Sequence, residues 1–371
     1  MEWNKEKFKV NEDLMDIVQE FPHNKVGITF NPNDYRKEID YFELFFTPEV
    51  YKTIITESNR YFEEKYIKSE NIYSSGTWQY HYIKNNIDIS DIKSYLAILL
   101  CMSIVELPRK NYYWSTDPLL RQQYIASIMP RLRFEMITAA LHLKEDIEEL
   151  DNNLTKILPF ISDLSKSYSK NYIMSQNIAI DESMIAFKGR SEYRFYMPMK
   201  PVKFGFKLHC LCESNTGYCY NFLLDVGKKN VKKSFQAEGI EKEVPKDYII
   251  SIVETLMESL PFSGYNLFLD SWYNSLEIAK RLSMKGFSVS GTMKSNASNL
   301  PKTAMKINLN LGEKEIRSSD LLSFTRWTDK KEMKLISSIY SGEKEVNHGK
   351  KERQMPEVVK EYTTNMRGIN T

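Results

Sequence analysis

The spacing of apolar residues changes character near the middle of the chain. Over roughly the first 145 residues, apolar side chains recur every three or four positions, which indicates amphipathic helices. One helix is predicted from residue 48 to about residue 68. A second begins at the capping pair Ser90-Asp91, is apolar around most of its circumference, and should end before Pro108. Residues 1–40 show little periodicity and are predicted to form a loosely ordered lead-in.

Beyond residue 175 the pattern predicts a sheet. Short apolar or alternating runs mark the predicted strands, which are 177–181, 204–210, 218–224, 265–270 and 287–292. The composition of residues 213–217 is typical of a hairpin turn between the second and third of these strands. Helical periodicity marks residues 248–260 and 276–282. This order predicts a mixed α/β sheet with helices packed on it.

Composition narrows the class of protein. Apolar residues make up 42% of the 371 residues and charged residues 27%, which is typical of a folded globular chain. The balance of 51 Lys and Arg against 49 Asp and Glu excludes a histone-like basic protein, although a local basic groove remains compatible with it. Four cysteines are too few for a disulfide scaffold, and neither a secretory signal nor a membrane-spanning apolar run is present. These features predict a soluble intracellular protein.

Two aspartates follow apolar runs that are predicted to be strands. Asp181 comes after residues 178–180, and Asp270 comes after residues 267–269. Carboxylates at the ends of neighbouring strands can hold Mg²⁺ or Mn²⁺, and phosphoryl-transfer enzymes use two such ions about 4 Å apart. We therefore expect the two carboxylates within roughly 4–8 Å of each other, on adjacent strands. Spacing alone equally fits aspartates that serve turns and helix caps, so it does not settle a metal site.

The residues around these aspartates carry a family resemblance. The segments 181–190, 196–207 and 270–276 closely resemble the signature of piggyBac-type transposases. Further matching segments are 104–114, 131–134, 286–301, 327–338 and 356–369, so the resemblance covers roughly residues 30–371. It implies an RNase H-like mixed-sheet catalytic core, an α-helical DNA-binding and dimerisation region and an insertion domain. It places these parts at 171–295, 41–170 and 296–350, with a final core helix beginning at 351–371.

The resemblance also assigns site residues. Asp181 and Asp270 match the first and second metal-binding aspartates of the family, and the third acidic position falls on Asn370. An amide in place of a carboxylate removes a charge worth about 4 kcal/mol at about 4 Å and an effective dielectric constant of about 20. The sequence ends at Thr371, before the family's zinc-binding tail. We therefore expect a transposase-derived protein with an incomplete DDE/D-type site and impaired or absent DNA strand transfer. A substitute acid would be Glu357 or Glu361.

Other hypotheses stay open at this point. The resemblance implies double-stranded DNA as the partner, with transposon ends and TTAA targets, as well as Mg²⁺ or Mn²⁺, a nuclear location and the option of a homodimer. One alternative is a non-enzymatic chromatin or protein-interaction module whose sheet is only a scaffold. Another is that the sequence is a truncated fragment of an active transposase.

Basic residues gather near both aspartates. Such residues usually form a solvated surface, but an excess of Lys and Arg beside an acidic site also fits a groove that follows phosphates. The DNA-binding candidates are Lys188, Arg190, Lys200, Lys203 and Lys207, with Arg194 beside them, and Lys294 and Asn296 after the last predicted strand.

A zinc site is the weaker interpretation of His209, Cys210, Cys212 and Cys219. His209 and Cys210 are neighbours on a predicted strand and should face opposite sides of the sheet. No second Cys-x₂-Cys pair completes a zinc site. We therefore expect buried core cysteines and no zinc.

Overall fold

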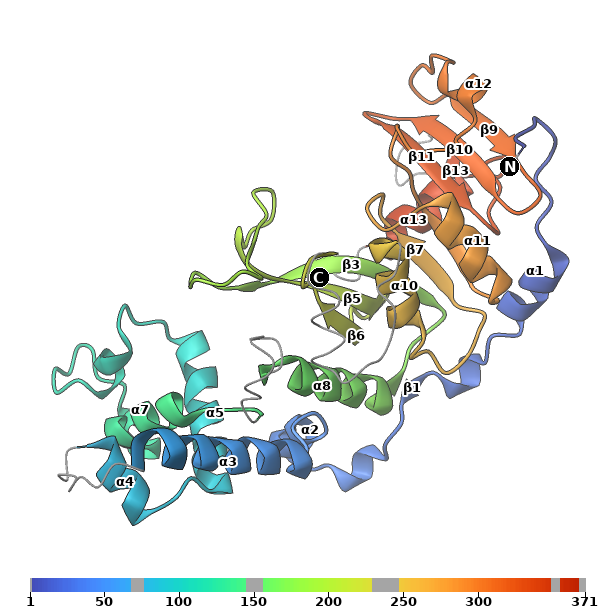
Figure 1. The fold of residues 1–371 in the computed structure, drawn as a ribbon. Helices are drawn as coiled ribbons and strands as arrows, with labels where there is room; N and C mark the ends of the chain where they lie inside the picture. Colours follow the sequence, from blue (N-terminus) through green and yellow to red (C-terminus); the bar gives the residue numbers. More distant parts are fainter. Residues whose placement is uncertain (1, 68–76, 145–155, 229–246, 348–353, 367–371) are drawn as a thin grey trace. The chain divides into compact units, whose positions relative to one another are not determined.

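The computed structural model describes residues 2–67, 77–144, 156–228, 247–347 and 354–366 (Figure 1). Asn370 and Thr371 lie outside these ranges. Contacts within the chain define two compact units, which are described separately. A helical unit comprises the described residues between 35 and 164, and a sheet unit comprises the described residues of 1–34, 165–231 and 243–371.

The helical unit confirms the mostly α-helical prediction. Its elements are α2 (Glu38–Glu43), α3 (Pro48–Phe62), η3 (Glu63–Ile67), α4 (Trp78–Lys84), α5 (Ile89–Ile104), η4 (Lys110–Trp114), α6 (Gln123–Ile128) and α7 (Arg131–Ala140). The next helix, α8 (Leu158–Asn171), begins here and continues into the sheet unit. Pro48 begins α3, where its missing N–H costs nothing. The core consists of aromatic and aliphatic side chains, including Phe62, Ile92, Ile98, Phe134 and Ile137.

Helix α5 differs from expectation in two ways. Its N-cap is Asp88, whose side chain accepts a hydrogen bond from the Asp91 amide, so the helix begins just before Ser90. The sequence predicted a helix buried on most sides. Ile92 and Ile98 are indeed buried, but Leu100 is 56% exposed and Ile104 is 82% exposed. An apolar circumference therefore did not mean burial near the end of this helix.

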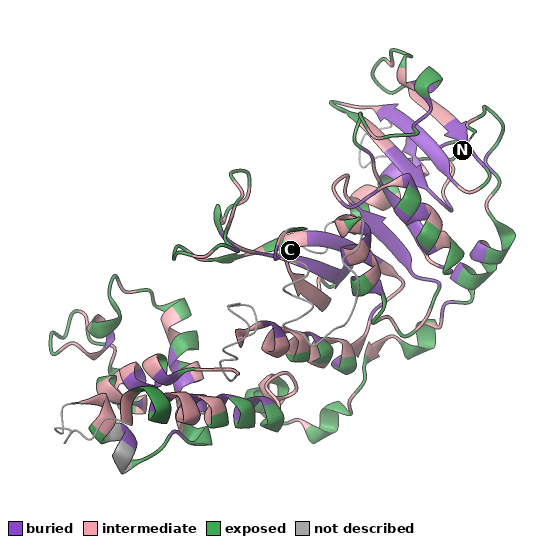
Figure 2. Cartoon of the chain, viewed as in Figure 1, coloured by how far each residue is buried: buried purple, intermediate pink, exposed green. Residues whose placement is uncertain are grey.

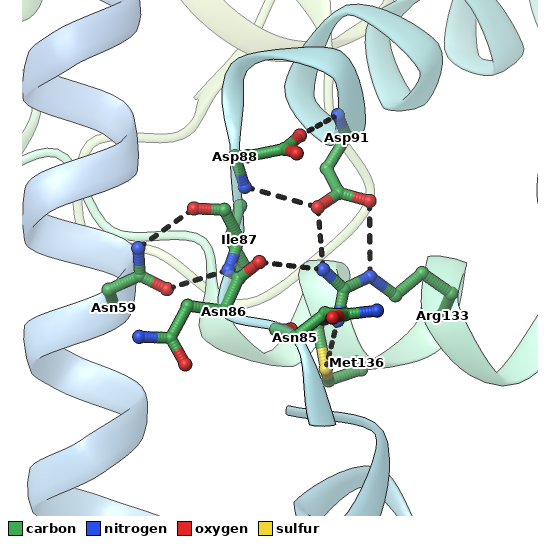
Figure 3. Close-up of polar contacts among 8 residues, drawn as sticks. All are labelled: Asn59, Asn85, Asn86, Ile87, Asp88, Asp91, Arg133 and Met136. Atoms are coloured by element: carbon green, nitrogen blue, oxygen red, sulfur yellow. Dashed lines mark hydrogen bonds and ion pairs between the residues drawn. The ribbon is translucent and has the colours of Figure 1, made fainter. Parts of the chain in front are cut away.

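One ion pair organises the approach to α5 (Figure 3). Arg133 of α7 forms a bidentate pair with Asp91, at 3.1 and 2.5 Å, and its remaining donors reach the carbonyls of Asn85 and Asn86 at 2.7 and 2.9 Å. Asn59 of α3 bonds both backbone groups of Ile87, as donor at 2.9 Å and as acceptor at 3.0 Å. The segment before α5 is thus fixed to α3 and α7.

Within the described residues, nine strands of the sheet unit form one mixed sheet in the order β4-β5-β3-β7-β8-β11-β10-β9, with β6 paired to β5. The strands are β3 (Asn177–Ala186), β4 (Phe195–Tyr196), β5 (Phe204–Glu213), β6 (Cys219–Leu224), β7 (Asn266–Leu269), β8 (Ser288–Thr292), β9 (Lys314–Ser318), β10 (Ser323–Thr328) and β11 (Glu332–Ser337). The central strands β3, β7 and β8 are parallel and the other pairs are antiparallel. The mixed α/β prediction is confirmed, and so is the hairpin between β5 and β6.

Strands β7 and β8 are buried along almost their whole length, and β3 is buried where it pairs with β7 and becomes exposed beyond Glu182 (Figure 2). Ile178, Ile180, Leu267 and Leu269 are at most 1% exposed, which is typical of a parallel strand covered on both faces. The sheet packs with α10 (Tyr248–Met257), α11 (Leu276–Met284) and α13 (Glu357–Asn365), close to the helices expected from sequence. In the described part of the chain, no helix is both long enough and apolar enough to cross a bilayer.

A row of amide side chains joins α13 to the start of the parallel strands. Ser288 donates to Asn266 at 2.6 Å, Asn266 donates to Asn177 at 2.9 Å, and Asn177 donates to Asn365 at 3.1 Å. The three donors stand at the first positions of β8, β7 and β3, and Asn365 is the last residue of α13. This row therefore fixes the end of the helix on the sheet.

Two regions are more integrated than the sequence suggested. The lead-in contains α1 (Glu12–Gln19), and its strand β1 (Gly27–Ile28) pairs with β2 (Tyr172–Ile173). Its apolar side chains Phe8, Leu14 and Phe21 are buried. Between residues 296 and 350, strands β9, β10 and β11 extend the central sheet beyond β8, which differs from a separate insertion domain. The remaining elements here are α12 (Lys302–Met305) and β12 (Glu345–Asn347), which pairs with β13 (Gln354–Pro356).

Candidate metal centre

Two of the predicted acids lie side by side where the parallel pairing of β3 and β7 ends. Ile180 of β3 is paired with Leu269 of β7, so Asp181, which lies within β3, and Asp270, which directly follows β7, are at the same level. Carboxylate oxygens of Asp181, Glu182 and Asp270 all lie within 4.8 Å of one another. This separation is in the range expected from the sequence. The described residues contain no other group of three or more acidic, histidine or cysteine side chains with this spacing.

Glu182 is a member of this cluster that the pattern did not single out. Neighbouring residues of a strand normally face opposite sides, which argues against Asp181 and Glu182 sharing a site. The Glu182 amide nevertheless donates to Asp181 Oδ1 at 2.8 Å, and the longer side chain brings its carboxylate to the same side. Lys200 Nζ lies 3.3 Å from Glu182 Oε1 and holds it there. Sequence adjacency to Asp181 was the one available signal.

The three carboxylates perturb one another. Burial raises the pKa of Asp181 to about 7, and the hydrogen bond and charge of Glu182 add to this shift. Burial acts to raise the pKa of Glu182 as well, but the hydrogen bond from Asp181 and the charge of Lys200 outweigh it, so this pKa is lowered. The pKa of Asp270 is raised, mainly by burial. A divalent cation would relieve this crowding, and an all-oxygen donor set is typical of Mg²⁺ and Mn²⁺.

Backbone amides fix the carboxylate of Asp270. Its Oδ1 accepts from the Trp272 amide at 2.8 Å and from the Tyr273 amide at 3.2 Å. The Asn274 amide donates to the Asp270 carbonyl at 3.0 Å, and the Asn274 side chain donates to the carbonyl of Thr292 at 3.1 Å. The turn after β7 is thus tied both to the aspartate and to the end of β8.

Asn370, which the resemblance matches to the third acidic position of the family, lies outside the described residues. The helix that precedes it in sequence, α13, places the Tyr362 hydroxyl 3.3 Å from Thr292 Oγ1. The charges of Asp270 and Asp181 contribute to raising the pKa of Tyr362 to about 12, although burial is the main cause. Tyr362 therefore lies near the acidic cluster.

Neither proposed substitute acid joins this cluster. Glu357 forms an ion pair with Lys344 at 2.5 Å, and Glu361 Oε2 accepts from the Asn365 amide group at 3.4 Å. Among the described acids, the third carboxylate beside Asp181 and Asp270 is instead Glu182.

The DNA-binding candidates fall into two accessible groups. Lys188, Arg190 and Lys203 are exposed on an extension that projects beyond β3 and β5 and contains β4 (Figure 1). Lys294 and Asn296 are exposed after β8, and the charge of Lys294 lowers the pKa of Asp270 against the larger effect of burial. Lys200 faces the acidic cluster rather than open solvent.

Aromatic and cationic groups alternate on the same extension. The Arg194 guanidinium donates to the Gly189 carbonyl at 2.8 Å and lies 5.4 Å from the Phe204 ring. Phe204 stacks on Tyr196, with ring centroids 4.6 Å apart, and both rings are exposed. Arg194 is therefore partly used to close the loop, while the two rings remain accessible.

Lys207 does not belong with these residues. It is 7% exposed, and its Nζ lies 2.7 Å from Asp225 Oδ2 and 4.4 Å from the centre of the Trp272 ring. The sequence placed Lys207 in the basic cluster because it follows five other cations closely. Its position on β5 turns it into the sheet unit instead, where it has no access to a phosphate.

The cysteines behave as core residues. Cys210 and Cys212 are buried, Cys219 is half-buried, and all three are free thiols. They lie on the paired strands β5 and β6, and His209, the neighbour of Cys210, bonds Tyr273.

Comparisons with known proteins agree with this architecture. A protein-family model described as Transposase IS4 matches residues 37–371. Human PiggyBac transposable element-derived protein 2 is 24% identical over 305 residues, which cover 80% of this chain and 47% of that protein. Human PiggyBac transposable element-derived protein 3 is 24% identical over 363 residues, covering 92% and 57% respectively. The chain thus spans about half the length of these relatives.

A solved structure has the same fold. The piggyBac transposase in a synaptic complex with hairpin DNA aligns with a TM-score of 0.72 at 23% identity, covering 93% of this chain and 69% of that one. This likeness confirms the RNase H-like fold expected for the mixed sheet. The piggyBac-derived relatives agree with the resemblance found in the motifs, and because the family model matches most of the sequence, the chain belongs to the transposase family that it describes.

Proposed function

We propose that this chain is a transposase-derived DNA-binding protein whose Asp181, Glu182 and Asp270 hold Mg²⁺ or Mn²⁺ beside bound DNA. The observation that carries this proposal is the convergence of three carboxylates at the point where the parallel pairing of β3 and β7 ends. A bound cation would stabilise charge on a phosphate oxygen or on an attacking water. With Asn370 at the third acidic position of the family, we infer that strand cleavage and transfer are impaired.

The surroundings of the cluster support a DNA partner. The exposed cations Lys188, Arg190 and Lys203 supply the charge that phosphates require, and the stacked rings of Tyr196 and Phe204 offer faces on which bases could lie. A nuclear location, recognition of transposon ends and TTAA targets, and a homodimer belong to the same proposal, because they follow from the family.

Cation binding tests the site directly. Mn²⁺ titrated into the protein and followed by electron paramagnetic resonance should give a site that Asp181→Asn and Asp270→Asn each weaken by roughly a thousandfold, because each removes a charge worth about 4 kcal/mol. Asp320→Asn, at an exposed position, is the matched control and should leave the affinity unchanged. Equal Mn²⁺ affinity in the Asp181 variant and the unaltered protein would contradict the proposal.

DNA binding is tested by its dependence on salt. Each phosphate contact adds about 0.9 to the slope of log K against log salt, so Lys188→Glu and Lys203→Glu should each reduce the slope by about one. Lys302→Glu, on α12 and also exposed, is the control with the same change of charge. Equal slopes in all variants would show that the DNA-binding surface lies elsewhere than on this extension.

Strand cleavage separates the impaired transposase from a DNA-binding scaffold. We expect weak or absent metal-dependent nicking of transposon-end DNA by the unaltered chain. Asn370→Asp restores the missing charge and should increase nicking if Asn370 is the limiting defect. Strong nicking by the unaltered chain that Asp181→Ala abolishes would instead indicate a complete site, with Glu182 as the first candidate for the third acid.

A further inference from the structure

The two amides that hold Asp270 belong to residues whose side chains reach a buried polar cluster. Trp272 and Tyr273 donate their amides to Asp270 Oδ1. Their rings face Lys207 and His209, which lie two residues apart on β5 and therefore on the same face of the sheet. Nothing in the proposed metal site accounts for these buried cationic and imidazole groups.

Asp225, just after β6, is the centre of this cluster. Its Oδ2 lies 2.7 Å from Lys207 Nζ and 3.1 Å from His209 Nε2. Its Oδ1 accepts from the Tyr248 hydroxyl at 2.7 Å and from the Gly227 amide at 2.8 Å. Burial alone would raise the pKa of Asp225, but its contacts with His209 and Lys207 hold it well below the ordinary value. The aspartate is thus a fixed, ionised anchor.

His209 connects Asp225 to the Trp272-Tyr273 turn, whose amides hold Asp270. Its Nδ1 lies 2.6 Å from the Tyr273 hydroxyl, and its other ring nitrogen faces Asp225. With the proton on the nitrogen beside the carboxylate, Nδ1 accepts from the Tyr273 O–H. The imidazole also stacks on Trp272, with ring centroids 5.4 Å apart at 13°, while Lys207 lies over the same indole.

We propose that Asp225, His209 and Lys207 form a positioning network that holds the Trp272-Tyr273 turn, and through its amides the carboxylate of Asp270, in the orientation required to bind a divalent cation. The inference rests on the proposed metal site. Its physical basis is that cation ligands must be held to within about 0.5 Å, and that groups supporting a ligand typically change metal affinity 10- to 100-fold. All residues of this network come from elements other than β7, so β7 alone does not fix Asp270.

Tyr273→Phe is the sharpest test, because it removes one hydroxyl and leaves both amide donors to Asp270 in place. We expect Mn²⁺ to bind about tenfold more weakly than to the unaltered protein. Tyr220→Phe is the matched control: the Tyr220 hydroxyl is also part of a buried residue and donates to a carbonyl, that of Ser259, at 2.9 Å. Both variants lose one hydrogen bond of a buried tyrosine, so we expect a similar fall in melting temperature for the two. Unchanged Mn²⁺ affinity is expected only for Tyr220→Phe.

Two substitutions of His209 separate positioning from simple packing. Asparagine can place an oxygen near the position of Nδ1 and so accept from Tyr273, whereas glutamine can reach Asp225 with a donor but leaves Tyr273 without its partner. We expect His209→Asn to bind Mn²⁺ more tightly than His209→Gln. The reverse order would overturn the link through Tyr273.

The outcomes distinguish this inference from the proposal on which it rests. Mn²⁺ binding that Asp181→Asn abolishes and Tyr273→Phe leaves unchanged would overturn the positioning network and retain the metal site. Failure of the unaltered protein to bind Mn²⁺ would overturn both.

Discussion

The helical and sheet units each contain a cation paired with a carboxylate that is largely shielded from solvent, but the two pairs have different further partners. The Arg133 guanidinium donates hydrogen bonds to Asp91, to two backbone carbonyls and to the Met136 sulfur at 3.6 Å (Figure 3). Lys207 and Asp225 continue instead through His209 to Tyr273. The Arg133 network ends at the backbone that it holds in place. The Lys207–Asp225 network ends at the turn whose amides hold Asp270, an acid of the proposed metal site.

The contrast teaches that the partners of a buried ion pair, more than its strength, indicate its role. Buried ion pairs recover little net stability, because two charges lose their hydration. The planar fork of arginine suits a bidentate clasp on a loop, whereas lysine is a point charge that can lie over an aromatic ring. The histidine between Asp225 and Tyr273 adds a directional hydrogen bond that an aspartate–lysine pair does not provide.

Removal of Asp225 should have the largest effect. Asp225→Ala leaves the buried Lys207 ammonium without a carboxylate partner. The side chain of Lys207 is only 9% exposed and that of Asp225 only 3% exposed. We expect the free energy of unfolding in urea to fall by about 3–5 kcal/mol. Mn²⁺ affinity, measured on the fraction that remains folded, should fall with it. A loss below about 1 kcal/mol would show that water or another group replaces Asp225 as the partner of Lys207. The contrast drawn between the Lys207–Asp225 and Arg133–Asp91 pairs would then not hold.

Removal of Asp91 should cost less and act only on the helical unit. The side chains of Arg133 and Asp91 are 12% and 18% exposed, so water screens the charge that Asp91→Ala leaves behind. We expect a loss of about 2–3 kcal/mol in urea unfolding, and no change in Mn²⁺ affinity. Asp88→Ser is the control, because serine also caps a helix and should leave stability nearly unchanged. An altered Mn²⁺ affinity in Asp91→Ala would mean that the two networks are coupled.

A further predicted effect is a pH dependence of the acidic cluster. Because the pKa of Asp181 is raised to about 7, a proton competes with the cation below that pH. We expect the Mn²⁺ dissociation constant to rise about tenfold per pH unit as the pH falls from about 7 to about 5, measured by calorimetric titration.

Without metal, the same shift has a further consequence for stability. Asp181 loses its proton near pH 4 in the unfolded chain and near pH 7 in the folded one, so the folded state is favoured at low pH and loses stability as the pH rises between these values. Thermal melts from pH 4 to pH 8 should record this trend, and Asp181→Asn should flatten it. An unchanged profile in that variant would contradict the assignment to Asp181.

The positions of Asp181 and Asp270 were predictable because they depend on local pattern. Short apolar runs before each acid predicted buried strands, and the parallel pairing of β3 with β7 brings the ends of these two runs together, although β3 continues beyond Asp181. Glu182 was harder to predict, since strand alternation argues against it, and its carboxylate joins the cluster through its longer side chain and its contact with Lys200.

The environment of Lys207 could not be predicted, because its partner is distant in sequence. Asp225 lies beyond the next strand, and no residue near Lys207 signals the pairing. A charge excess in residues 181–207 is compatible with both exposed and buried lysines, and only the fold separates Lys207 from Lys203. The integration of the lead-in and of β9–β11 into one unit depends on similarly non-local pairing, such as the bridge between Asn4 and Ser318.

The amide row at the start of the parallel strands has a consequence for the order of folding. Asn365 meets Asn177 across 188 positions of sequence, so the contact that fixes α13 closes one of the longest loops in the sheet unit. Closing such a loop costs chain entropy that only an already paired β3, β7 and β8 can compensate. We therefore expect α13 to dock after the central strands have formed, and substitutions of Asn365 to accelerate unfolding while leaving the folding rate nearly unchanged.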